Sequence, residues 1–421
     1  MDTARDVVID IKNLSVHFGL QGGSFARLVG RDTGTIKAVE GVNLQLRRGE
    51  VIGLVGESGS GKSTLGRALL GLVPATDGSI IFKGDDIAEM SKHELRAIRR
   101  DVQMVFQDPN AALNPAMTVE AAVGDALRVH GMKSAAERRP HVISALERVG
   151  LSPVELFLSK YPRDLSGGQK QRVVLARAII MDPSVLVADE PISMLDMSVR
   201  AKILQLMLDL KDRLELSYVY ITHDLASAKF FCDRIAIMYL GKIVELGSTD
   251  QIFNDPKHPY TRALLAAIPE PDPSIAKKAE LLQGEIPDAA EPPVGCAFHP
   301  RCPAAFDKCG WEPRDLVATI EAHWLKSGVA TFESERQELA NLDELRDQRG
   351  GSAVLRPAGS ASTQDLHALL DEARSEDPEG RFWTGVADIS EEGTGLEVSF
   401  HPGEEPELRR SGEVEVACHL Y

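Results

Sequence analysis

Residues 56–64 have the types and spacing needed to bind phosphate groups. The segment reads GESGSGKST and fits the pattern G-x-x-x-x-G-K-[ST]. Its glycines let backbone N–H groups approach phosphate oxygens, a lysine reaches the terminal phosphates, and a serine hydroxyl can bind Mg²⁺. An apolar strand pattern precedes the segment and a helical pattern follows it, as this loop requires. The candidate nucleotide ligands are Gly56, Ser58, Gly59, Ser60, Gly61, Lys62, Ser63 and Thr64.

Polar residues end three further strand patterns. The apolar run Val185–Ala188 leads into Asp189 and Glu190. Successive side chains of a strand point to opposite sides, so one carboxylate can face Mg²⁺ and the other an attacking water. Gln107 and His223 end two more strand patterns. Ligands bind at the carboxyl ends of strands in open α/β sheets, so these side chains are predicted to converge on the phosphates.

Two other features could complete a nucleotide site. Leu165–Gln169 reads LSGGQ directly before the helical pattern Gln171–Ile180, and a serine followed by glycines at a helix start favours a second anion-binding N-terminus. Phe18 precedes the phosphate loop, where its ring could either stack on adenine or belong to the core.

Strand and helix patterns alternate along the first part of the chain, which predicts an α/β fold. Val7–Phe18 has the alternation of an edge strand, with Val39–Leu46 as its partner. Val119–Val149 and Val199–Leu216 have helical periodicity. Residues 235–246 resemble a closing hairpin.

Charge is concentrated at the end of the chain. The formal net charge is −16, and the segment from Glu312 to the C-terminus holds 24 acidic against 10 basic residues. This favours a solvated acidic surface and argues against nucleic acid as a partner. The chain has no apolar run of 18 residues and no apolar signal core after Met1, so a cytoplasmic location is expected.

The order and approximate spacing of these motifs resemble the ATP-binding subunits of ABC transporters, over about residues 7–268. The resemblance implies a P-loop nucleotide-binding domain with a helical subdomain at about residues 108–180. It also implies a dimer, in which ATP lies between the phosphate loop of one subunit and the LSGGQ segment of the other.

The resemblance implies roles for single residues as well. Glu190 would polarise the attacking water, His223 would steady the γ-phosphate, and Gln107 would contact Mg²⁺ and that water. Ser63 and Asp189 would complete the Mg²⁺ site. Further residues implied at the ATP site are Ser166, Gly167, Gly168, Gln169 and Asp196.

One segment departs from the family pattern. The usual sequence Glu-Pro-Thr-Ser-Ala-Leu-Asp here has Ile192 and Met194 in place of threonine and alanine. Both are bulkier apolar residues, so altered packing at the dimer interface is expected, without loss of hydrolysis.

A narrower resemblance is to the oligopeptide and dipeptide importer branch. It rests on the segments Phe106–Pro109, His258–Leu265, Ile268–Pro271, Gly284–Pro287 and His299–Pro303. The implied substrate is a peptide. The implied partners are integral-membrane permease subunits and a second ATPase subunit, which is either a copy of this chain or, as the resemblance favours, a different chain. An extracytoplasmic substrate-binding protein would be an indirect partner. The chain would then lie at the cytoplasmic face of the membrane.

Two other functions remain open from the sequence. An importer of oligosaccharides or metals would have the same ATPase domain, because this domain does not contact the transported substrate. A soluble ABC-type ATPase acting on nucleic acid or translation complexes is less favoured, since the chain has neither two cassettes nor long coiled coils nor a basic face.

Four of the five cysteines are candidates for a metal centre. Cys296, Cys302 and Cys309 have the spacing C-x5-C-x6-C, without the paired C-x2-C of most zinc sites, and Cys418 follows about a hundred residues later. In some members of the peptide-importer branch similar cysteines are associated with a 4Fe-4S cluster, to which thiolates are suited. Zinc and free structural thiols are the alternatives. Cys232 lies in an apolar segment and is expected in the core.

The sequence therefore predicts four segments. Residues 1–268 form the ATPase domain, 269–314 a proline- and cysteine-rich region, 315–405 an inserted acidic α+β module, and 406–421 a C-terminal strand that carries Cys418. Within the module, Ser362–Asp365 resembles a capping box before a helix to Arg374, and residues 396–400 alternate as a strand. The sequence does not indicate what the module does.

Overall fold

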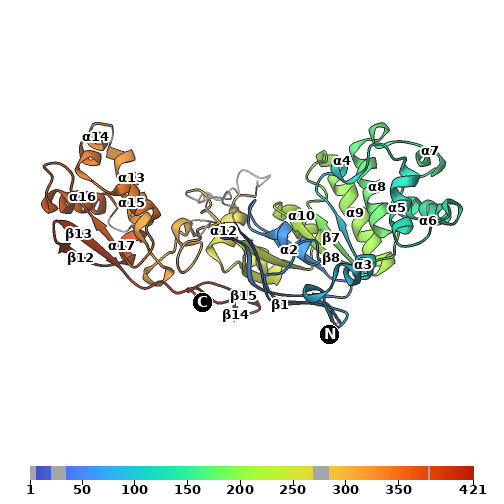
Figure 1. Ribbon diagram of the computed structural model, residues 1–421, viewed down its shortest axis with the longest axis horizontal. Coiled ribbons are helices and arrows are strands. Elements are labelled where there is room, and N and C mark those ends of the chain that lie inside the picture. Colours follow the sequence, from blue (N-terminus) through green and yellow to red (C-terminus); the bar gives the residue numbers. More distant parts are fainter. Residues whose placement is uncertain (1–5, 20–34, 269–283, 328, 378–379) are drawn as a thin grey trace, which may run out of the picture. The chain divides into compact units, whose positions relative to one another are not determined.

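The computed structural model describes residues 6–19, 35–268, 284–327, 329–377 and 380–421. The chain forms two compact units (Figure 1). The first comprises Met1–Pro256 with Gly412–Glu415, and the second comprises Lys257–Ser411 with Val416–Tyr421. The four-segment division predicted from the sequence stays a prediction, and the motif at Ile268–Pro271 lies mostly outside the described residues.

A largely parallel sheet in the first unit brings the ends of the predicted strands to one edge. Its central order is β10-β9-β3-β8-β7-β6, with β15 beyond β10. Val55 pairs with Thr222 and Asp189 pairs with Ile221, so neighbouring strands end nearly level. The strands are β3 (Val51–Val55), β6 (Val102–Val105), β7 (Val185–Asp189), β8 (Ser217–Thr222), β9 (Arg234–Tyr239), β10 (Lys242–Ser248) and β15 (Val414–Val416).

Most residues of these strands are buried, because α2 (Lys62–Ala68), α10 (Leu225–Phe231) and β2 (Thr35–Arg47) pack against the sheet. The β9 and β10 strands are antiparallel, which confirms the predicted hairpin. The polar residues that follow the strands therefore stand at a common edge of the sheet.

The second sheet of this unit is antiparallel, in the order β2-β1-β4-β5. The prediction that Val7–Phe18 is an edge strand is wrong, because β1 pairs with β2 on one side and with β4 on the other. Alternation in a strand reports which faces are buried, and it does not report how many neighbours the strand has. The strands are β1 (Val7–Gly19), β2 (Thr35–Arg47), β4 (Asp77–Phe82) and β5 (Asp85–Asp86).

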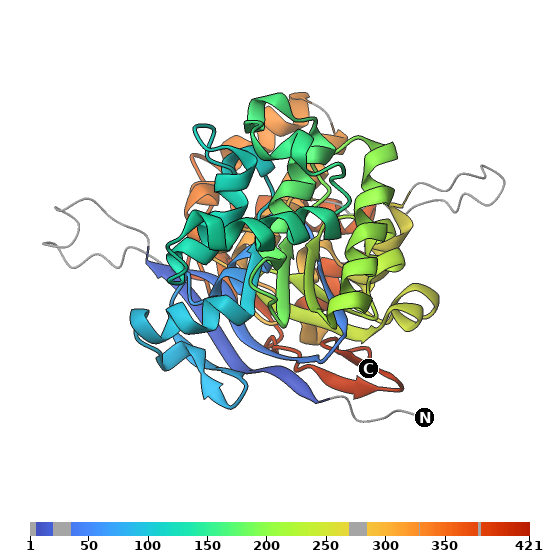
Figure 2. The ribbon, with the colours of Figure 1, turned by 90° about the vertical axis from the view of Figure 1, so that its right-hand side faces the viewer.

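Helices α4 to α8 pack mainly against one another and form a helical subdomain, which faces the viewer in Figure 2. By contrast, α2 (Lys62–Ala68) packs against β7 and β8. The other helices of the unit are α3 (Lys92–Asp101), α4 (Pro109–Ala112), α5 (Val119–Val129), α6 (Ala135–Arg148), α7 (Glu155–Leu158), α8 (Gly167–Ile179), α9 (Met197–Leu214), α10 (Leu225–Phe231) and α11 (Thr249–Asn254).

The second unit contains a three-stranded antiparallel sheet, β11-β13-β12, with helices packed against it. The predicted helix and strand are both present, as α16 and β13, and Leu396, Val398 and Phe400 are buried. The elements are α12 (Pro259–Ala266), α13 (Pro313–Ser327), α14 (Val329–Glu338), α15 (Leu342–Asp347), α16 (Thr363–Glu376), α17 (Arg381–Gly385), β11 (Ser352–Leu355), β12 (Val386–Glu392), β13 (Gly395–Phe400) and β14 (Arg409–Ser411).

No helix in the described part of the chain is both long enough and apolar enough to cross a membrane.

Candidate functional site

The phosphate loop connects β3 to α2 and is closed around its own lysine. Lys62 Nζ donates hydrogen bonds to the carbonyl oxygens of Gly56 (2.8 Å) and Glu57 (2.7 Å) and to Ser60 Oγ (3.1 Å). Burial lowers the pKa of Lys62, although nearby carboxylates raise it. The ammonium group is thus held over the loop by groups that phosphate oxygens can replace.

Two glycines of the loop allow close packing of the backbone. A Cβ atom on Gly61 would lie 2.1 Å from the carbonyl oxygen of Ala38, and one on Gly56 would lie 2.2 Å from that of Met238. Gly61 also has a φ of 97°, in the left-handed region. No other residue type fits these positions, which explains the spacing of glycines in the sequence.

Ser63 and Asp189 form an oxygen-rich pair. Ser63 Oγ donates to Asp189 Oδ1 over 2.9 Å. Asp189 is buried at the end of β7, and burial raises the pKa of its carboxyl group against the opposing effect of the serine. A hydroxyl and a carboxylate are ligands that suit Mg²⁺, which would also compensate the buried charge. Both residues fit the Mg²⁺ site predicted from the sequence.

Glu190 is the meeting point of three strand ends. Its Oε2 accepts a hydrogen bond from Gln107 Nε2 (2.8 Å), and its Oε1 lies 2.9 Å from His223 Nδ1. The backbone of Glu190 is left-handed, with a φ of 45°, and its N–H donates to the carbonyl of Ile221. This uncommon conformation turns Glu190 away from the line of β7 and aims its carboxylate between the neighbouring strands.

The loop after Glu190 is held by a residue that the sequence analysis missed. Arg200 donates from Nε to the carbonyl oxygen of Leu195 (2.8 Å) and from Nη2 to that of Ser193 (3.3 Å). Ser193 Oγ donates in turn to the carbonyl oxygen of Glu190 (3.0 Å). An arginine in the first turn of α9, next to unsatisfied loop carbonyls, is the signal that could have identified it.

The two departures from the family pattern behave differently. Met194 is 63% exposed, whereas Ile192 is only 4% exposed and belongs to the core. The expectation that both would lie at a dimer interface is therefore wrong for Ile192, whose side chain points inward. Asp196 is exposed at the N-cap of α9.

The LSGGQ segment starts α8 with a capping box. Gln169 N donates to Ser166 Oγ (3.3 Å), and Ser166 N donates to Gln169 Oε1 (3.0 Å). Ser166 and Gly167 are exposed, and a Cβ on Gly168 would lie 2.8 Å from Val199 Cγ1. Since α8 packs with α4, α5 and α6, while α2 packs on the sheet, the two anion-binding helix starts belong to different parts of the unit (Figure 1).

Phe18 lies near the end of β1 and is 41% exposed. Phe18 is therefore not part of the core that the described residues form. A stacking role toward adenine stays a prediction.

The four candidate cysteines come together in the second unit. Cys296, Cys302 and Cys309 are buried, Cys418 is half-buried, and each of the buried thiols interacts electrostatically with Cys418. Burial, together with the neighbouring thiols, raises the pKa of Cys296 to about 12 and that of Cys302 to about 11. Such thiols ionise readily only when a cation compensates the charge, so this donor set fits a metal centre.

Comparison with protein families matches residues 39–193 to "ABC transporter" and residues 244–309 to "Oligopeptide/dipeptide transporter, C-terminal region". The oligopeptide transport ATP-binding protein OppF of Escherichia coli (strain K12) is 45% identical over 308 residues, covering 72% of this chain and 91% of that protein. The oligopeptide transport ATP-binding protein AppF of Bacillus subtilis (strain 168) is 42% identical over 324 residues, covering 76% and 97%. The chain belongs to the ABC transporter ATPases.

Solved structures agree with this assignment. The dimeric post-hydrolysis ATP-binding cassette MJ0796, bound to ADP and Pi, is similar with a TM-score of 0.50 and 32% identity, covering 57% of this chain and 98% of that one. The predicted fold class and ATPase activity are thereby confirmed for the ABC cassette, which uses ATP and Mg²⁺. Cys418 lies beyond the matched C-terminal region, which ends at residue 309.

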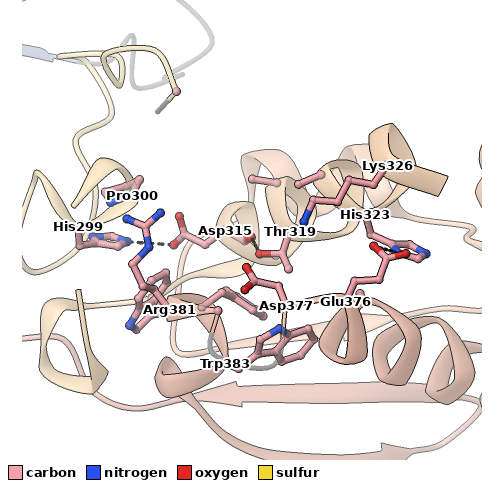
Figure 3. A pocket seen from close by; sticks show the side chains of 17 residues that line it. His299, Pro300, Asp315, Thr319, His323, Lys326, Glu376, Asp377, Arg381 and Trp383 are labelled. Carbon is pink, nitrogen blue, oxygen red and sulfur yellow. Dashed lines mark hydrogen bonds and ion pairs between the residues drawn. The ribbon is translucent and has the colours of Figure 1, made fainter. Parts of the chain in front are cut away.

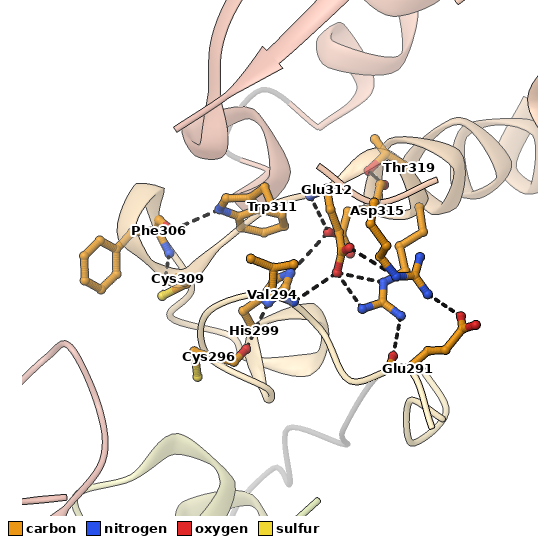
Figure 4. Close-up of polar contacts among 12 residues, drawn as sticks. Glu291, Val294, Cys296, His299, Phe306, Cys309, Trp311, Glu312, Asp315 and Thr319 are labelled. Atoms are coloured by element: carbon orange, nitrogen blue, oxygen red, sulfur yellow. Dashed lines mark hydrogen bonds and ion pairs between the residues drawn. The ribbon is translucent and has the colours of Figure 1, made fainter. Parts of the chain in front are cut away.

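In this ABC ATPase, the loop that carries Cys296 is held by hydrogen bonds and an ion pair to residues at the start of α13 (Figure 4). The His299 ring donates from Nδ1 to the carbonyl oxygen of Cys296 (2.9 Å), and its Nε2 lies 3.2 Å from an Asp315 carboxylate oxygen. The fully buried Glu312 accepts a hydrogen bond from Val294 N (3.1 Å). These contacts fix the backbone around Cys296 before any metal binds.

Proposed function

We propose that this chain is the ATPase subunit that powers peptide import through an ABC transporter. The observation that carries the proposal is the match of residues 244–309 to the oligopeptide/dipeptide C-terminal region, joined to a cassette in which Gln107 and His223 meet at Glu190. The relatives OppF and AppF are named as oligopeptide transport ATP-binding proteins.

Hydrolysis is proposed to occur at a composite site between two cassettes. The loop around Lys62 and the pair Ser63–Asp189 would hold the phosphates and Mg²⁺, and Glu190 would polarise the attacking water. Ser166 at the exposed start of α8 would complete the site of a neighbouring subunit. Phosphoryl transfer requires positioning and charge neutralisation, which is what these groups provide.

The proposed partners are those that the likeness to the peptide-importer ATPases implies. Permease subunits would receive the closing motion through the helices after Gln107, with a second, related ATPase as the other half of the dimer. An extracytoplasmic substrate-binding protein would act indirectly, and the chain would lie peripherally at the cytoplasmic face of the membrane.

Copurification from native membranes tests the function. Recovery with integral-membrane permeases whose complex stimulates ATP turnover on addition of peptide supports the proposal. Stimulation by oligosaccharide or metal instead would identify a related importer. Recovery with ribosomes or DNA, without a membrane protein, would contradict transport altogether.

At the cysteines we favour a 4Fe-4S cluster over zinc. Four sulfurs around one tetrahedral zinc lie roughly 3.8 Å apart. Within the described residues, the cysteines form no group of three whose sulfurs all lie within 4.8 Å of one another. Backbone N–H groups of Ala304 and Phe306 donate to Cys302 and Cys309 Sγ, as cluster sulfurs favour.

Spectra and metal content decide between these centres. Protein purified without oxygen should show broad visible absorption and contain iron, and both should decrease in Cys302→Ser while Cys232→Ser retains them. Colourless protein that contains zinc in place of iron would overturn the cluster assignment.

A further inference from the structure

Helices α13, α14 and α16 of the second unit converge on one buried histidine. His323 on α13 has a side chain that is only 3% exposed. Its Nε2 lies 3.3 Å from Glu335 Oε2 on α14, and its Nδ1 lies 3.0 Å from Glu376 Oε2 on α16. Figure 3 shows the ring of His323 facing Glu376. The three helices pack against one another, so these contacts join all of them.

A third carboxylate completes the group. The ligand atoms of His323, Glu335 and Glu372 all lie within 4.8 Å of one another. Around a tetrahedral Zn²⁺ such atoms lie roughly 3.4 Å apart, since zinc binds nitrogen and oxygen at about 2.0–2.2 Å. Glu372 is exposed and can close this difference by rotating its side chain.

The hydrogen bonds orient these groups toward a common point. Trp324 Nε1 donates to Glu335 Oε2 over 2.7 Å, which holds that carboxylate beside the histidine. With Glu376 accepting from Nδ1–H, the favoured tautomer keeps the Nε2 lone pair for a cation that Glu335 and Glu372 would bind from the same side. A histidine that binds metal usually donates its other ring N–H to a carboxylate in this way.

The balance of charge also favours a cation. Three carboxylates surround a ring that can carry at most one positive charge. His323 and Glu376 also line a cavity of about 340 Å³, together with Lys326 and Asp377 (Figure 3).

We propose that His323, Glu335 and Glu372 form a divalent transition-metal site that joins α13, α14 and α16, with Glu376 positioning the histidine. A mixed set of one imidazole and two carboxylates suits Zn²⁺. This site is separate from the cysteine cluster and from the Mg²⁺ of the ATPase, and it stabilises the fold around the three helices.

Zinc binding to the full-length chain tests the site. Each variant is equilibrated with buffered Zn²⁺, and the zinc per chain is measured by mass spectrometry. His323→Ala and Glu372→Ala should bind one zinc ion fewer than the wild type. Asp371→Ala and His367→Ala, which change neighbouring residues of α16, should bind as much as the wild type. Zinc held by cysteines cancels in this comparison, because all variants retain them.

A second measurement separates a ligand from a structural residue. Glu376→Gln should keep the stoichiometry but weaken zinc binding by about 10–100-fold, as expected for a group that orients a ligand. Zn²⁺ should raise the thermal midpoint of the wild type by more than that of Glu372→Ala, because only the wild type has the complete site. Since Glu372 is exposed, this variant keeps the fold even if His323→Ala does not. Equal zinc content in the wild type and in Glu372→Ala would overturn the proposal.

Discussion

At the residue scale, the position of Glu190 depends on an unusual backbone. Its left-handed φ places the carboxylate beyond the end of β7, where Gln107 and His223 reach it from neighbouring strands. A residue at this position with an ordinary extended backbone would instead continue the direction of β7. The geometry therefore separates the task of Asp189, which faces Ser63, from that of Glu190.

Glu190→Gln should retain ATP binding and slow hydrolysis by about 10²–10⁴-fold, because the amide cannot accept a proton from water. Steady-state phosphate release and nucleotide binding measure the two effects. Glu215→Gln is the matched control, since Glu215 is exposed and bonded to Arg48. Unchanged turnover in Glu190→Gln would show that another group polarises the water.

A pH effect is expected from His258, which begins the peptide-importer motif. Complete burial, and secondarily Arg262, lower the pKa of His258 to about 3 from 6.5. Below pH 6.5 the unfolded chain binds a proton that the folded chain excludes, so stability falls as the pH decreases toward 3. The slope is about 1.4 kcal/mol per pH unit for this one group.

Urea unfolding above and below pH 6.5 measures this slope. His258→Asn can still cap α12, since His258 Nδ1 accepts from Tyr260 N. It should flatten the acid dependence, whereas the exposed His141→Asn should not. The same slope in His258→Asn as in the wild type would contradict the assignment.

At the element scale, capping boxes recur at helices with different roles. Ser166 caps α8 at the proposed dimer contact, and Ser248 caps α11 in the same unit with the same reciprocal bonds to a glutamine. The two serines are equivalent as caps. Ser166 is exposed, whereas Ser248 is half-buried, and only Ser166 lies at the proposed contact with a second subunit.

Ser166→Ala and Ser248→Ala should each lower the free energy of unfolding by about 1 kcal/mol, because each loses one cap. Only Ser166→Ala should also reduce ATP turnover, by at least about tenfold if one charge-assisted contact to phosphate is lost. Chemical unfolding and phosphate release provide the two readings. Equal turnover in the two variants would place the γ-phosphate contact elsewhere.

At the scale of the whole molecule, the proposed hydrolysis requires two cassettes. In the Glu190→Gln variant, ATP with Mg²⁺ should increase the fraction of this chain that is associated with the second ATPase subunit. The reason is that unhydrolysed nucleotide stays bound between the two cassettes. Lys62→Ala should abolish the increase, because the loop then loses its phosphate-binding ammonium group. Analytical ultracentrifugation with and without ATP measures the association, and an increase in Lys62→Ala would contradict the composite site.

The sequence by itself determined the phosphate loop, the strands that precede the polar residues, and the cap before α8. These features follow local rules: glycine conformation, apolar runs and capping act over a few residues. The same locality explains why the sequence predicts the helix that begins at Thr363 and why its motifs indicate the family.

Tertiary structure decided which distant residues come into contact and which of them are buried, including contacts that the sequence only suggested. It brought Cys418 to three cysteines about a hundred residues earlier, placed Ile192 in the core, put β1 inside its sheet, and gathered carboxylates around His323. Such contacts depend on how loops close and how helices pack, and no local pattern encodes them.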